Sequence, residues 1–191
     1  LCVAALADLA ALDGVALAAV YDFAGVARVV DVGGGRGAML AALLVANPNL
    51  RGILFDRPEA ACEARTTLKH AGVGERAAVE VGDPADGVPT GADLYVLRHV
   101  VGELDDERAT RLLANCRRAA ARDGRVLVLE PATACEPADV ERLVVARRRE
   151  RTTGEYRALL ARAGLRLVRV VPMRSATSAF EAIAAEREEG I

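Results

Sequence analysis

The stretch that decides the fold reads Val29-Val30-Asp31-Val32-Gly33-Gly34-Gly35-Arg36-Gly37-Ala38-Met39-Leu40. A β-branched apolar run comes first, a turn with four glycines in five positions follows, and helix-forming residues come last. This order is typical of a buried strand, a glycine turn and the start of a helix. Because glycine permits positive φ and a close ligand approach, the turn predicts a site for a nucleotide-like ligand. The alternative is a tight turn that binds no ligand.

The composition limits the classes of protein to consider. The 191 residues are 52% hydrophobic and only 3% aromatic, and the formal net charge is −2. This length fits one domain with an aliphatic core. The near-neutral charge gives no indication of a nucleic-acid or membrane-surface binder. Two aspartates, Asp8 and Asp13, interrupt the apolar opening run, so we expect neither a signal peptide nor a transmembrane helix there.

The cysteines and histidines give no indication of a metal site. The two histidines lie far apart, and no CxxC pair occurs among the four scattered cysteines, Cys2, Cys62, Cys116 and Cys135. We therefore expect reduced thiols in a cytoplasmic protein, and no bound metal.

Strand and helix patterns alternate along most of the chain, which predicts a doubly wound parallel α/β sheet. Two final strands with a short link predict an antiparallel hairpin. We expect a helical lead-in over 1–25, a ligand-binding domain over 26–185 and a charged tail over 186–191. The expected strands are 26–32, 52–55, 77–81, 92–97, 124–129, 165–172 and 176–184, and the expected helices are 1–20, 38–46, 58–70, 105–122, 139–149 and 155–163.

Polar residues gather where the predicted parallel strands end, which is where such sheets bind ligands. Asp56 is placed to accept hydrogen bonds from ribose hydroxyls, or else it is a helix N-cap. Asp83 can reach an adenine amino group, or else it forms an Asp-Pro turn. Asp31 can orient the amino-acid end of a ligand, or else it stabilises the turn. The spacing Gly33-x-Gly35-x-x-Ala38 also matches a dinucleotide fingerprint, which leaves NAD open as the ligand.

Several motifs in the same order resemble one family. They are Val30-Asp31-Val32-Gly33-Gly34-Gly35-Arg36-Gly37, Leu54-Phe55-Asp56-Arg57-Pro58, Gly82-Asp83, Asp105-Asp106-Glu107-Arg108 and Arg149-Glu150-Arg151-Thr152. Together they are similar to the catalytic domain of the bacterial S-adenosylmethionine-dependent small-molecule O-methyltransferases. That family resembles the plant caffeate-type enzymes and includes antibiotic-tailoring enzymes.

The resemblance implies a Rossmann-like class I methyltransferase fold, a seven-stranded sheet with helices on both faces and an antiparallel C-terminal hairpin. It implies S-adenosyl-L-methionine as cofactor and a small aromatic or polyketide-like substrate that carries a hydroxyl. It also implies that an N-terminal dimerisation and winged-helix region is missing here, and the alternatives are a homodimer or a chain without its dimerisation region. By position in the family, Gly33 and Gly35 contact the cofactor, Asp56 its ribose and Asp83 its adenine. Arg98 stands where the family usually has a lysine near the cofactor.

The segment that carries the general base in the family has a different sequence here. The family segment Leu-Lys-x-Val-Leu-His-Asp-Trp-x-Asp, whose His is the general base, corresponds here to Leu97-Arg98-His99-Val100-Val101-Gly102-Glu103-Leu104-Asp105-Asp106. Gly102 occupies the base position, and glycine cannot accept a proton. His99 is a candidate relocated base, or else a histidine hydrogen-bonded at a strand end. Glu103 is another candidate base, or else a solvated acid.

Two acids and two arginines complete the expected site. Glu130 and Glu150 match the family's acids that orient the base or line the pocket. Arg147 and Arg148 replace two family glycines, which indicates an anionic substrate or a filled pocket, or else a solvated basic helix face.

Other functions remain open. The chain can be a cofactor-binding relative with cyclase, decarboxylase or hydroxylase chemistry, or a catalytically inactive partner subunit. An NAD-dependent dehydrogenase is a further alternative, although the C-terminal hairpin and Gly82-Asp83 speak against it.

Overall fold

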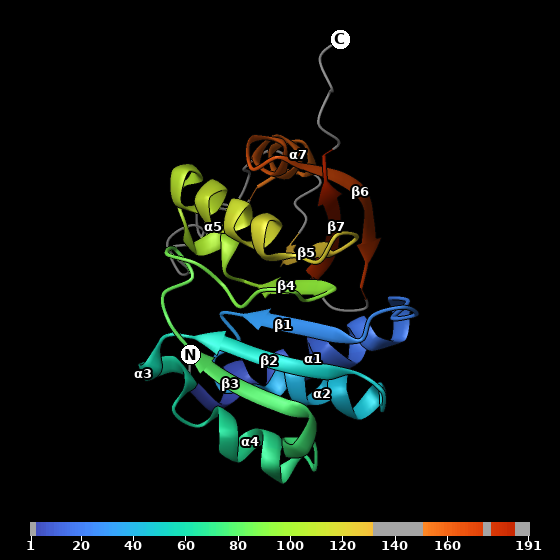
Figure 1. Ribbon diagram of the computed structural model, residues 1–191, viewed down its shortest axis with the longest axis vertical. Helices are drawn as coiled ribbons and strands as arrows, with labels where there is room; N and C mark the ends of the chain where they lie inside the picture. The colour runs from blue at the N-terminus through green and yellow to red at the C-terminus, as the bar shows by residue number, and fades with distance from the viewer. Residues whose placement is uncertain (1–2, 132–150, 174–176, 186–191) are drawn as a thin grey trace.

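The computed structural model describes residues 3–131, 151–173 and 177–185. Seven strands form one sheet in the order β3-β2-β1-β4-β5-β7-β6 (Figure 1). The first five strands run parallel, and β7 pairs antiparallel with both β5 and β6. The strands are β1 Arg28–Val32, β2 Arg51–Asp56, β3 Ala77–Val81, β4 Leu94–Arg98, β5 Arg125–Pro131, β6 Leu165–Pro172 and β7 Thr177–Ala184. The predicted mixed sheet, with its antiparallel C-terminal hairpin, is confirmed.

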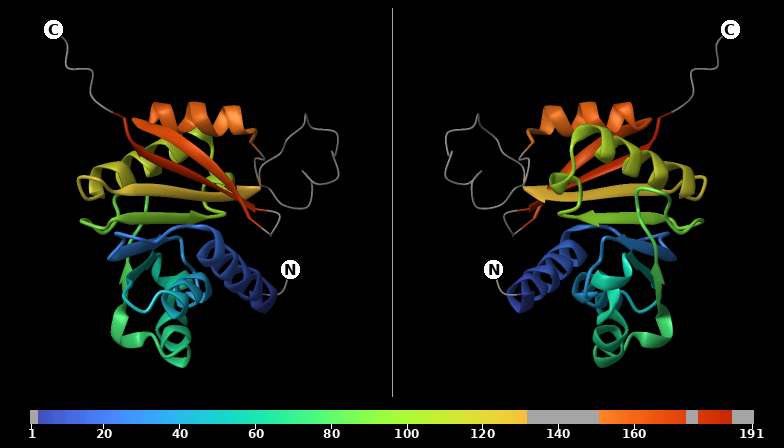
Figure 2. Two further views of the ribbon diagram at one scale, coloured as in Figure 1. Left: turned by 90° about the vertical axis from the view of Figure 1, so that its right-hand side faces the viewer. Right: turned by 90° about the vertical axis from the view of Figure 1, so that its left-hand side faces the viewer.

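Helices cover both faces of the sheet (Figures 1 and 2). One apolar core lies under α1, α2 and α4, and Leu17, Leu40 and Leu68 represent these helices in it. The second core lies under α5 and α7, with Leu113 and Leu160. Every residue of β1 after Arg28 and every residue of β4 before Arg98 is buried, which suits strands that are covered on both sides. The helices are α1 Val3–Val20, α2 Ala38–Ala46, α3 Pro58–Ala61, α4 Ala64–His70, α5 Asp106–Ala119 and α7 Thr153–Arg162, with 3₁₀ turns η1 Gly74–Arg76 and η2 Val101–Glu103.

Several boundaries differ from the sequence prediction by one or a few residues, and three of the differences have a local cause. The first strand begins at Arg28, because the amides of Ala27 and Arg28 donate to the Asp93 carboxylate instead of entering the ladder earlier. The helix expected over 58–70 is two helices that are separated by Cys62 and Glu63, and the Glu63 side chain pairs with Arg36. The helix expected over 105–122 ends at 119, because the next residue has an extended backbone.

Side-chain caps mark the starts of two helices, and the second of them begins at Thr153, two residues before the expected start. Asp105 Oδ1 accepts from the Arg108 amide at 2.9 Å at the start of α5. Thr152 and Glu155 form a reciprocal capping box at the start of α7. The expected helix over 139–149, with Arg147 and Arg148, lies outside the described residues, as does the tail over 186–191. Among the helices that the structure describes, none combines the length and apolar character needed to cross a bilayer.

Candidate functional site

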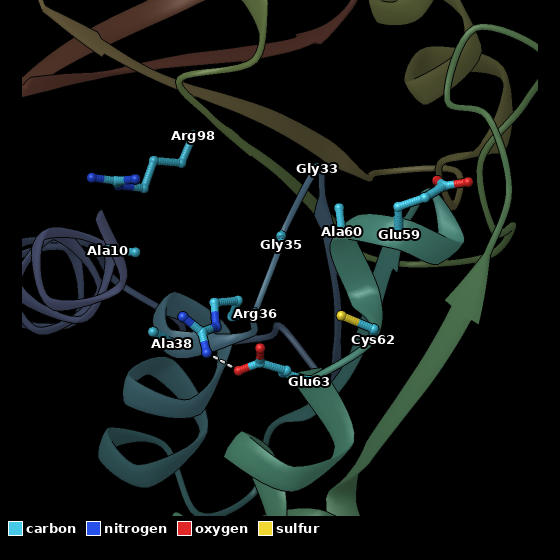
Figure 3. Close-up of a pocket in the computed structure, with 11 residues that line it drawn as sticks. Ala10, Gly33, Gly35, Arg36, Ala38, Glu59, Ala60, Cys62, Glu63 and Arg98 are labelled. Carbon is cyan, nitrogen blue, oxygen red and sulfur yellow. Dashed lines mark ion pairs between the residues drawn. The ribbon is translucent and has the colours of Figure 1, made fainter. Parts of the chain in front are cut away.

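A cavity of about 370 Å³ opens at the carboxyl ends of the central strands (Figure 3). The glycine turn forms its floor, Ala10 of α1 and Arg98 lie on one side, and residues of α3 lie on the other. This is the edge at which the sequence predicts the ligand. The lining residues are Ala10, Gly33, Gly34, Gly35, Arg36, Ala38, Glu59, Ala60, Cys62, Glu63 and Arg98.

The glycine turn depends on backbone conformations and spaces that other residues would not fit. Gly33, Gly35 and Gly37 have φ of 71°, 53° and 82°, which confirms the predicted positive φ. A Cβ on Gly33 would lie 2.5 Å from Cγ2 of Val100. A Cβ on Gly35 would meet nothing within 4 Å, and Gly35 lines the cavity. The turn therefore leaves open space above its backbone, where a ligand can approach.

Asp56 ties the end of β2 to the glycine turn. Its Oδ2 accepts from the Gly35 amide at 2.8 Å, and its Oδ1 accepts from the Arg57 amide at 2.7 Å. The N-cap alternative is wrong, since Arg57 occupies the N-cap position of α3. Each carboxylate oxygen keeps a further lone pair for a ligand hydroxyl. The ribose-binding role of Asp56 stays a prediction.

Asp31 is fully buried directly beneath the turn. A Cβ on Gly34 would lie 2.7 Å from Asp31 Oδ2, and neither carboxyl oxygen has a hydrogen-bond partner among the described residues. The Leu40 backbone amide lies nearby without reaching hydrogen-bonding geometry. Burial, with a smaller contribution from the Asp56 charge, raises the pKa of Asp31 to about 7, although Arg98 acts in the opposite direction. Asp31 is not among the residues that line the cavity, so its contact with a cationic or hydrogen-donating group of a ligand stays a prediction.

Asp83 forms the Asp-Pro turn that the sequence predicts as the alternative to a ligand contact. Its side chain is exposed, and its Oδ1 accepts from the Ala85 amide at 2.8 Å. Asp83 is absent from the cavity lining, so its proposed contact with an adenine stays a prediction.

Arg98 pairs with a residue that sequence reasoning missed. Its Nε donates to Asp13 Oδ2 of α1 at 2.6 Å, and both side chains are largely buried. In the sequence, Asp13 stood out only as a polar interruption of an apolar helix. A single buried acid on such a helix is the signal that could have found it, because a buried charge needs a partner.

His99, Gly102 and Glu130 meet at the end of β4. His99 follows the strand with φ of 57°, and its Nδ1 lies 3.3 Å from Glu130 Oε2. Glu130 Oε1 accepts from the Gly102 amide at 2.7 Å. A Cβ on Gly102 would lie 2.9 Å from Glu130 Oε2, so Glu130 occupies the space of a side chain at position 102. A left-handed conformation on a non-glycine residue is costly and often marks a functional position.

Comparison with known proteins decides the family. A family model described as an O-methyltransferase domain matches residues 2–166. The chain belongs to this O-methyltransferase family. It is 41% identical over 162 residues to the mitomycin biosynthesis 6-O-methyltransferase of Streptomyces lavendulae, an alignment that covers 82% of this chain and 46% of that protein.

Solved structures of family members have the same fold. The mitomycin 7-O-methyltransferase matches with a TM-score of 0.87 and 37% identity, over 93% of this chain and 54% of that one. An O-methyltransferase from neocarzinostatin biosynthesis, in complex with S-adenosylmethionine and 2-hydroxy-5-methyl naphthoic acid, matches with a TM-score of 0.84 and 37% identity. That match covers 95% of this chain and 57% of the other. The chain thus spans about half the length of these relatives.

The cavity of this O-methyltransferase domain fits the family cofactor, S-adenosyl-L-methionine. That molecule carries a nucleoside, an ammonium group, a carboxylate and a positively charged sulfur. The open glycine turn suits the nucleoside end, the unpartnered Asp31 suits a cation, and Arg98 suits a carboxylate. Within the described residues, no His, Cys, Asp and Glu side chains gather in a group of three or more that would hold a metal ion.

Arg151 holds in place the segment over 101–106, which differs from the family pattern at Gly102. The sequence did not indicate this role. The terminal nitrogens of Arg151 donate to the carbonyls of Val101 and Leu104 at 2.9 and 2.8 Å, and also to Asp106 Oδ1 at 2.9 Å. The 3₁₀ turn that contains Gly102 is therefore fixed from outside the sheet. Glu150, the neighbouring candidate acid, lies outside the described residues.

Proposed function

We propose that the protein is an S-adenosyl-L-methionine-dependent O-methyltransferase that acts on a hydroxyl of a small aromatic or polyketide-like metabolite. The observation that carries the proposal is the cavity in which an open glycine turn lies above the unpartnered carboxyl of Asp31. Membership of the O-methyltransferase family and the bound cofactor in a related structure support it. Because the chain spans about half of its relatives, this activity is proposed for the whole protein.

In this proposal, the residues in and around the cavity each bind one part of the cofactor. Bound S-adenosyl-L-methionine supplies a methyl group that is activated by the positive charge on its sulfur. The Gly33 and Gly35 backbone leaves room for the nucleoside, Asp56 accepts from ribose hydroxyls, and Asp83 accepts from the adenine amino group. Arg98 binds the carboxylate, and Asp31 stabilises the cationic groups.

His99 is the proposed general base. In the tautomer that donates from Nδ1 to Glu130, the lone pair on Nε2 can take the proton of the acceptor hydroxyl. The imidazolium that forms lies between two carboxylates, because Asp13 Oδ2 is 3.9 Å from Nε2. Asp13, Arg98 and Glu130 carry a combined charge of −1, so the positive charge of the imidazolium brings the net charge of the cluster to zero. Glu150 remains a candidate for a substrate contact.

A second candidate function is favoured by Gly102. The amide of Gly102 and the Glu130 carboxylate fill the position of the family base. A cofactor-binding protein with cyclase, decarboxylase or hydroxylase chemistry, or an inactive partner subunit, would tolerate this loss. Such a protein would bind the cofactor and leave hydroxylated acceptors unmethylated.

The test is methyl transfer to a panel of phenols, followed by mass spectrometry of the products. His99→Ala should lower the rate about 10²- to 10⁴-fold, because a general base contributes that much. His70→Ala is the matched control, since His70 is the other histidine and is exposed on α4. A His99→Ala rate equal to wild type would refute the relocated base. Cofactor binding without methylation of any acceptor would favour the second candidate function.

Two further features belong to the proposal for the whole protein. One is homodimerisation through an N-terminal region such as the family has, and the half-length match to relatives is compatible with it. The other is a cytoplasmic location, where thiols such as those of Cys62 and Cys116 stay reduced.

A further inference from the structure

Asp13 of α1 contacts three residues near the cavity and the candidate base, namely Arg98, His99 and Thr177. It lies in an otherwise Ala- and Leu-rich helix, and 4% of its surface is exposed. Oδ2 accepts from Arg98 Nε at 2.6 Å, and Oδ1 accepts from Thr177 Oγ1 of β7 at 3.0 Å. The same Oδ2 lies 3.9 Å from His99 Nε2. Both oxygens of this buried carboxylate are therefore engaged, and its strongest contact is with a cavity residue.

The contact with Asp13 fixes the direction of Arg98. The guanidinium uses Nε for Asp13, and in the part of the chain that the structure describes its terminal nitrogens bond no other residue. Arg98 and Ala10 lie together on the α1 side of the cavity (Figure 3). The planar guanidinium keeps its terminal N–H donors in a fixed relation to Nε. Holding Nε therefore also sets where these donors point.

A second carboxyl competes for Arg98. Asp31 lies beneath the glycine turn with no hydrogen-bond partner among the described residues, and the positive charge of Arg98 lowers its pKa, against the larger effect of burial. A guanidinium released from Asp13 would be attracted to Asp31 whenever that carboxyl is ionised. That movement would neutralise the carboxyl that suits a cationic ligand group, and it would withdraw the cation that suits a carboxylate.

We propose that Asp13 is a positioning residue that keeps Arg98 on the α1 side of the cavity, apart from Asp31, so that the two can bind opposite charges of one amino-acid group. The ligand class is a nucleoside that carries an amino acid. The inference rests on the proposed function, because it assumes that the cavity takes S-adenosyl-L-methionine. It assigns α1 a part in cofactor binding that goes beyond covering the sheet.

The test is calorimetric titration with two ligands, which needs no methyl acceptor. S-adenosyl-L-homocysteine carries the amino-acid group, and 5′-methylthioadenosine lacks it. Asp13→Asn should weaken binding of the first about 10- to 100-fold, the value of one charge-assisted hydrogen bond. Binding of the second should not change. Thr177→Val is the control, since it removes the other hydrogen bond to Asp13 and leaves Arg98 Nε paired.

An Arg98→Ala background separates positioning from support of the fold. There, Asp13→Asn should cause no additional loss of S-adenosyl-L-homocysteine affinity. An equal loss in both backgrounds, or an equal loss for both ligands, would overturn the proposal. Asp13→Glu serves as the second variant if Asp13→Asn does not fold, with the same expected pattern. A wild-type protein that binds neither ligand would refute the proposed function itself.

Discussion

Replacing Asp31 with asparagine should change how the stability of the protein depends on pH. The carboxyl is fully buried without a hydrogen-bond partner among the described residues, and burial is the main cause that raises its pKa from 3.8 to about 7. Between these two values the unfolded chain releases the proton while the folded chain keeps it. Stability contributed by the protonated form is therefore complete below pH 3.8 and is lost as the pH rises through 7.

The size of the effect follows from the shift. A difference of about 3 units corresponds to about 4 kcal/mol across the whole window, and about 2.5 kcal/mol of this falls between pH 5 and pH 8. Asparagine has nearly the same shape and does not ionise. As the pH is raised from 5 to 8, the unfolding free energy of Asp31→Asn should therefore rise by about 2.5 kcal/mol relative to that of wild type.

Urea unfolding at a series of pH values measures this difference directly. Asp86→Asn is the matched control, because Asp86 is exposed, and its pH dependence should follow that of wild type. If Asp31→Asn and wild type lost stability in parallel from pH 5 to pH 8, Asp31 would be ionised in the folded protein. Such a result would show that burial does not hold a proton on Asp31 in the ligand-free protein.

Two other predictions concern thiols and the segment that contains Gly102. At pH 8 iodoacetamide should alkylate exposed Cys62, and S-adenosyl-L-homocysteine should slow this reaction because Cys62 lines the cavity. Cys116 should stay unmodified, since burial raises its pKa to about 12; peptide mass spectrometry reads both sites, and equal labelling would contradict this. Arg151→Met should cost about 3 kcal/mol in urea unfolding and speed hydrogen exchange at the Gly102 amide, because two backbone carbonyls lose buried donors. Unchanged exchange there would show that Arg151 does not hold the segment.

The sequence was sufficient for the fold because strand and helix signals repeat along the chain. Apolar runs, glycine turns and helix caps are local, so β1, the turn after it and the caps at Asp105 and Thr152 follow from nearby residues. Boundaries were less certain where a distant side chain intervenes. The Asp93 carboxylate, for example, accepts from the amides of Ala27 and Arg28, and the first strand begins at Arg28 and not at residue 26.

In the candidate site too, features set by nearby residues could be predicted, and features that depend on distant residues could not. The glycine turn could be predicted because positive φ and a close approach are properties of glycine itself. The roles of Asp13 and Arg151 could not, because each depends on partners 45 to 164 residues away that only the folded chain brings close. The sequence identified Gly102 as the missing base, yet the structure was needed to reveal that Glu130 fills its place.

The central claim is that this cavity binds the methyl-donor cofactor, and calorimetric titration of the wild-type chain tests it most directly. Titration with S-adenosyl-L-methionine should show one binding site per chain, and titration with NAD should show no binding. Binding of NAD with no heat from S-adenosyl-L-methionine would contradict the account, and so would the absence of binding by either ligand.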